Sequence, residues 1–69
     1  MADNNTNDNT LTIELHLVEA HALALAQFVK RVGWSDFRTN AVDDAEAYEI
    51  RAAVDALQRA LAEAGFAPR

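Results

Sequence analysis

The sequence predicts a small, mainly α-helical domain in which one N-terminal β-strand precedes a two-helix hairpin (β-α-α), behind a disordered tail. Three features predict this order: a period-two alternation over residues 10–17, a helical apolar stripe over 18–32, and a second helical stripe over 47–64. Residues 1–9 contain four asparagines and almost no apolar side chain, which is typical of disorder. The 69-residue chain therefore divides into a tail, residues 1–9, and one domain, residues 10–69.

The strand prediction concerns residues 10–17, TLTIELHL, where apolar and polar side chains alternate strictly. A strand with one buried face has this period. The members of its apolar row are Leu11, Ile13, Leu15 and Leu17. A lone strand leaves half of its backbone groups unpaired, so this one requires a second edge, and a second copy of the chain is the simplest source.

A helix is predicted from residue 18, where apolar residues begin to recur at intervals of four and three. The stripe consists of Val18, Ala22, Leu25, Val29 and Val32, widened by Ala26 and Phe28. Lys30 and Arg31 suit the C-terminal end of the helix dipole. We expect Gly33 to end the helix in the left-handed conformation, with Trp34 packing back on Val29.

Residues 34–42 connect the two helices and carry two aromatic side chains. We expect Ser35 to cap a short turn over residues 36–38. Interface hot spots are enriched in tryptophan, tyrosine and arginine. The candidate contact residues of this region and the following helix are Trp34, Phe37, Arg38 and Tyr48. The alternative is that these side chains close the open end of the helical hairpin.

The second helix is predicted to begin at Asp43, because Asp43 and Glu46 have the spacing of a reciprocal capping pair. Its apolar stripe consists of Ala47, Ile50, Val54, Leu57, Leu61 and Ala64. Gly65 is expected to end this helix in the left-handed conformation, with Phe66 reaching back to Leu61.

Composition indicates that one copy of the chain has a thin core. Although 51% of the residues are hydrophobic, much of that fraction is alanine, which buries little area. A folded domain this small usually needs stabilisation beyond its own core, from disulfides, a structural metal or a partner chain. The absence of cysteine excludes disulfides and thiolate zinc sites. We therefore expect a partner chain, either a second copy in a homodimer or another protein.

The chain is acidic, with 11 aspartates and glutamates against 6 lysines and arginines and a formal net charge of −5. DNA binding depends on cationic side chains that neutralise phosphates, so this balance disfavours nucleic-acid partners. No apolar run approaches the roughly 20 residues that span a bilayer, and no basic stretch precedes an apolar one as in a secretory signal. We expect a cytoplasmic protein without a membrane partner.

No pattern indicates catalysis, and we expect a non-enzymatic protein without a cofactor or metal. There is no cysteine nucleophile, and both glycines stand at predicted helix ends rather than in a phosphate loop. Ser35, His21 and Asp36 are better explained by local structure than as a catalytic triad. His16 and His21 have no recognised metal-ligand spacing, and the carboxylates within residues 43–49 suit a helix N-terminus.

Residues 11–35 resemble the first half of a ribbon-helix-helix protein. The likeness lies in the alternating strand LTIELHL, a helix that begins one residue later, and the closing GWS at residues 33–35. This resemblance implies an intertwined dimer whose paired strands enter the DNA major groove, as in many repressors and antitoxins. It would place Thr12, Glu14 and His16 against DNA, and it supplies the alternative function of a DNA-binding regulator or antitoxin.

Residues 21–69 resemble short uncharacterised bacterial proteins that also occur in prophage regions. The likeness is carried by FVKRVGWSDFR, by the DDAEAY start of the second helix and by the LAEAGFAPR ending. It implies a family without an established activity, so it transfers no function. The residues themselves favour a small non-enzymatic module for protein interaction or self-association, in a process that the sequence does not name.

Overall fold

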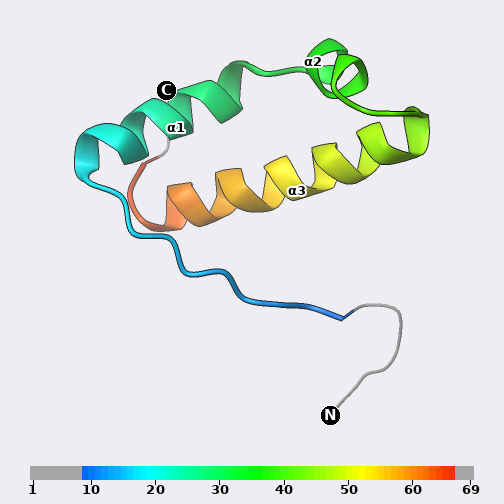
Figure 1. Ribbon diagram of the computed structural model, residues 1–69. Helices are drawn as coiled ribbons and strands as arrows, with labels where there is room; N and C mark the ends of the chain where they lie inside the picture. The colour runs from blue at the N-terminus through cyan, green and yellow to red at the C-terminus, as the bar shows by residue number, and fades with distance from the viewer. Residues whose placement is uncertain (1–8, 67–69) are drawn as a thin grey trace.

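The computed structural model describes residues 9–66, and within that range the chain forms three α-helices. They are α1 (Glu19–Arg31), α2 (Trp34–Thr39) and α3 (Asp44–Glu63). Helices α1 and α2 follow one another along the same side of α3, and both pack on it (Figure 1). The architecture is therefore a helical hairpin of two layers, in which the long α3 is covered by two shorter helices.

The predicted N-terminal β-strand is wrong, because no strand is present between residues 9 and 66. Residues 9–18, which we call the N-terminal segment, are extended and exposed, and they lead away from α1 (Figure 1). An alternating pattern specifies which side chains share a face, but a strand also needs a hydrogen-bonded neighbour. The described part of the chain has no second extended segment beside it. The observed class is all-α, not β-α-α.

The predicted disordered tail, residues 1–9, lies outside the described residues except for Asn9, which is exposed. The start of the first helix agrees with the sequence to within one residue. Val18 has the extended conformation of an N-cap, with φ −68° and ψ 159°, and Glu19 occupies the first turn.

Helix α1 ends differently from the prediction. Val32 and Gly33 are both extended, with φ values of −67° and −136°, so Gly33 is not in the left-handed region. Instead, Gly33 is the N-cap of α2. Its N–H donates a hydrogen bond to Oδ2 of Asp36 at 2.9 Å, and its carbonyl accepts one from the Asp36 N–H at 3.0 Å. Gly33 therefore acts as the N-cap of α2 and not as the left-handed end of α1.

This capping changes the predicted connection. The short turn expected over residues 36–38 is a six-residue helix that begins at Trp34. Ser35 lies inside that helix, so the predicted cap at Ser35 is wrong. Asp36 lies three residues after Gly33, which is the position from which a carboxylate reaches back to the N-cap amide.

The start of α3 confirms the predicted cap at Asp43, whose Oδ1 accepts a hydrogen bond from the Glu46 N–H at 2.9 Å. The reciprocal bond differs by one residue. Oε1 of Glu46 accepts from the Val42 N–H at 2.7 Å rather than from Asp43. The two carboxylates thus fix the direction in which the chain enters α3.

The end of α3 confirms the predicted left-handed glycine, because Gly65 has φ 100°. The Phe66 N–H donates to the Leu61 carbonyl at 2.8 Å, and the Gly65 N–H donates to the Ala62 carbonyl at 3.0 Å. These two bonds define a Schellman motif. The Phe66 side chain turns back on a buried cluster that includes Leu61.

The core is thin, as composition predicts. The buried hydrophobic residues among those described are Ala22, Ala26, Val29, Ala47 and Leu61. Three of these five are alanine, and no large side chain is fully buried. The Cα radius of gyration is 14.0 Å, whereas a compact domain of this length has a value of about 11 Å. The hairpin is therefore held by a narrow seam, and the chain exposes more of itself than a compact domain does.

The two glycines give a test of these helix ends. A Cβ at Gly33 meets no atom within 4 Å at an ordinary φ, so we expect Gly33→Ala to leave the free energy of unfolding unchanged or to raise it by up to about 1 kcal/mol. Gly65→Ala forces a side chain to φ 100°, and we expect a loss of about 1–2 kcal/mol. Urea unfolding followed by circular dichroism measures both. Equal losses at the two positions would contradict the assigned conformations.

Candidate functional site

The most exposed apolar surface lies on the N-terminal segment. Its apolar row consists of Leu11, Ile13, Leu15 and Leu17, with exposed fractions of 73%, 78%, 57% and 38%. Fully burying a side chain of this size gains about 1.5–3 kcal/mol. Contiguous exposed apolar surface of this kind marks interaction sites in soluble proteins. In the structure the apolar row is therefore exposed to solvent and available to contact a partner, although it is not part of a strand.

The polar side of the same segment carries a charge pair. Nε2 of His16 lies 2.9 Å from Oε2 of Glu14, an ion pair when His16 is protonated. Both side chains are at least 80% exposed, and exposed pairs contribute little stability. Glu14 is the only aspartate or glutamate between residues 9 and 18, so it sets the charge of the segment.

Two of the predicted contact residues, Trp34 and Tyr48, meet across α2 and α3. Their ring centroids are 4.6 Å apart with an interplanar angle of 43°. Pairs with this geometry contribute about 0.5–1.5 kcal/mol beyond the area they bury. The ring contact of Trp34 is therefore with the first turns of α3, near the connection between α2 and α3.

The other two predicted contact residues have different surroundings. Nε of Arg38 donates a hydrogen bond to Oδ1 of Asp44 at 2.6 Å, and its NH1 group donates to the Ala41 carbonyl at 3.2 Å. Arg38 thus ties the end of α2 to the start of α3. Phe37 is half-buried and lines a groove that no pattern in the sequence indicates.

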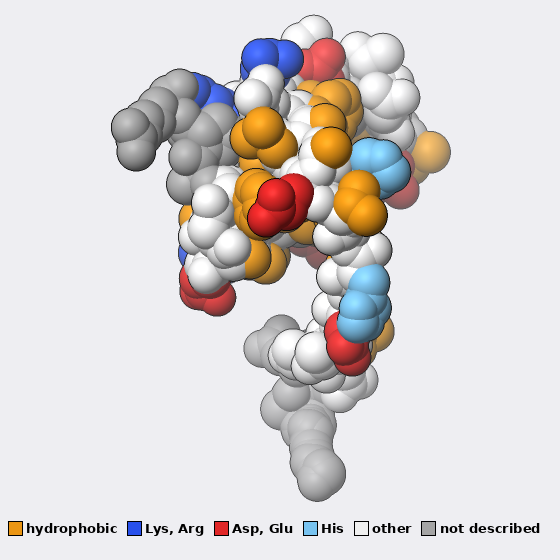
Figure 2. All heavy atoms as spheres, turned by 90° about the vertical axis from the view of Figure 1, so that its left-hand side faces the viewer, with side chains coloured by type: hydrophobic (Ala, Val, Ile, Leu, Met, Phe, Trp, Pro, Cys, Tyr) orange, Lys and Arg blue, Asp and Glu red, His pale blue; other side chains and the backbone are white. Residues whose placement is uncertain are grey.

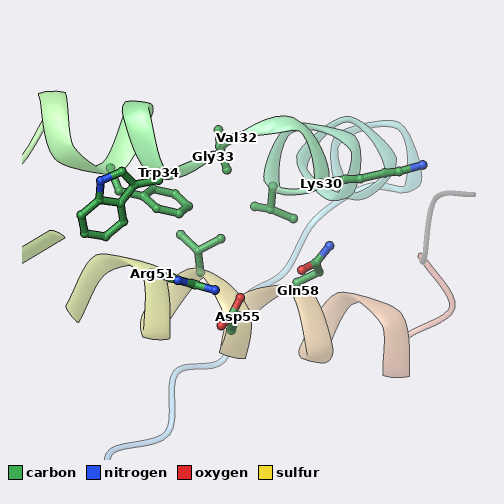
Figure 3. Close-up of a pocket in the computed structure, with 10 residues that line it drawn as sticks. Lys30, Val32, Gly33, Trp34, Arg51, Asp55 and Gln58 are labelled. Atoms are coloured by element: carbon green, nitrogen blue, oxygen red, sulfur yellow. The ribbon is translucent and has the colours of Figure 1, made fainter. Parts of the chain in front are cut away.

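The groove lies where the chain breaks between α1 and α2, opposite the middle of α3 (Figure 3). We call it the elbow groove. It encloses about 330 Å³. Its walls are formed on one side by Val29, Lys30, Val32, Gly33, Trp34 and Phe37, and on the other by Arg51, Val54, Asp55 and Gln58. A continuous helix in place of α1 and α2 would cover this part of α3.

The elbow groove combines an apolar floor with a polar rim. Val29 is 5% exposed and Val54 is half-buried, so aliphatic side chains form the floor. Arg51, Asp55 and Gln58 of α3 supply the polar side chains of the rim, whereas the Lys30 side chain points away from the groove (Figure 3). Arg51 and Asp55 bring one charge of each sign to this side of the groove.

The end of the hairpin from which the N-terminal segment leaves is also partly apolar. In the first half of α1, Leu23 is 46% exposed. Figure 2 views this end and shows hydrophobic side chains at the surface among acidic and basic ones. Because charges interrupt it, we assign no separate site to this end.

The residues considered for chemistry are engaged in local structure. The Asp36 carboxylate accepts a hydrogen bond from the Gly33 N–H, and Asp43 and Glu46 form the cap of α3. Among residues 9–66 no group of three or more histidine, aspartate or glutamate side chains is arranged to hold a metal ion. No helix within the same range has both the length and the apolar character required to cross a membrane.

A family model described as "Family of unknown function (DUF7706)" matches residues 1–69, which is the whole chain. Searches of curated proteins and of solved structures give no match. The prediction of a family without an established activity is thereby confirmed. The bacterial or prophage occurrence and the ribbon-helix-helix likeness stay predictions.

The ring contact gives a prediction with a built-in reporter, because Trp34 is the only tryptophan. We expect Tyr48→Ala to lower the free energy of unfolding by about 0.5–1.5 kcal/mol and to shift the fluorescence of Trp34 to the red, since the indole loses the ring that covers it. Tyr48→Phe keeps the ring and serves as the control. Unchanged fluorescence in Tyr48→Ala would contradict the contact.

Proposed function

The chain belongs to the DUF7706 family, whose function is unknown, and for it we propose a non-enzymatic role as a small protein-interaction module that associates with a second copy of itself. The contact surface is the N-terminal segment with its apolar row. The observation that carries the proposal is the exposure of that row, from 38% to 78% over four side chains that share one face. The cellular process that the module serves stays unknown.

The thin core supports self-association over an isolated chain. Only five hydrophobic residues are buried within the described range, and Val29 and Leu61 are the only two of them larger than alanine. Small domains commonly complete such cores with a partner subunit. The apolar row is an exposed apolar surface in the described part of the chain, and it stands directly before α1.

The expected affinity follows from the exposed row. Two copies contribute eight side chains that are on average roughly 60% exposed, and at 1.5–3 kcal/mol each their burial gains about 7–14 kcal/mol. Association costs an estimated 4–15 kcal/mol of translational and rotational entropy, and ordering the side chains and the segment costs more. Because the two ranges overlap, we expect a dimer whose population depends on protein concentration.

The non-enzymatic role is supported by what the polar side chains do. Asp36, Asp43 and Glu46 cap helix ends, and Asp44 pairs with Arg38. These contacts stabilise local structure, and they engage the carboxylates at the starts of α2 and α3. No specific observation favours the DNA-binding alternative, whose reading face would carry Glu14 at its centre.

A charge placed in the apolar row tests the proposal. We expect Ile13→Lys to reduce the mass measured by light scattering from two chains to one at tens of micromolar, because a buried lysine without a partner is costly. Thr12→Lys adds the same charge on the polar side and is the matched control, with the dimer retained. A wild-type mass of one chain at every concentration would rule out self-association.

A further inference from the structure

We draw no further inference here: the strongest candidate, the exposed surface patch of Trp34, Val42 and Tyr48 between α2 and the start of α3, has neighbouring carboxylates that are engaged in helix caps and an ion pair, and nothing in the structure shows what covers it.

Discussion

The structure depends on one packing contact, the seam in which Ala26 and Val29 of α1 meet Leu61 of α3. Alanine lets two helices approach closely but buries little apolar area. The seam therefore sets how α1 and α3 pack, but it contributes little to the free energy of folding. Within the described residues no third layer packs on the two layers of the hairpin. Phe66, turned back by the left-handed Gly65, extends the seam at its open end. The exposed apolar row is apolar surface that a partner chain could still bury.

Most of the helical structure could be predicted from sequence because its determinants are local. The periodic stripes, the cap at Asp43 and the Schellman ending at Gly65 each depend on residues within five positions of one another. Gly33 shows the limit of such patterns. A glycine after a basic turn is typical of a helix end, yet Asp36 holds its N–H and makes it the start of α2. The three-residue spacing of Gly33 and Asp36 was the signal that could have corrected the prediction.

The strand could not be predicted correctly because pairing is not a local property. Alternation specifies an extended backbone with one apolar face, and the structure shows residues 9–18 outside any helix, with the apolar side chains exposed. Whether an extended segment becomes a strand depends on a neighbour that the pattern does not contain. The same limit applies to the site. Sequence identified the apolar row and the pair Trp34 and Tyr48, but the elbow groove arises from the break between α1 and α2 over Val54, which only the folded chain brings together.

The central claim is that this thin hairpin gains stability from a second copy. Thermal unfolding over a hundredfold range of protein concentration tests it most directly, because dissociation coupled to unfolding makes Tm depend on concentration. For two chains that unfold at about 0.7 kcal/mol of enthalpy per residue, we expect Tm to rise by roughly 10 °C over that range. A Tm that is the same at every concentration would contradict the claim.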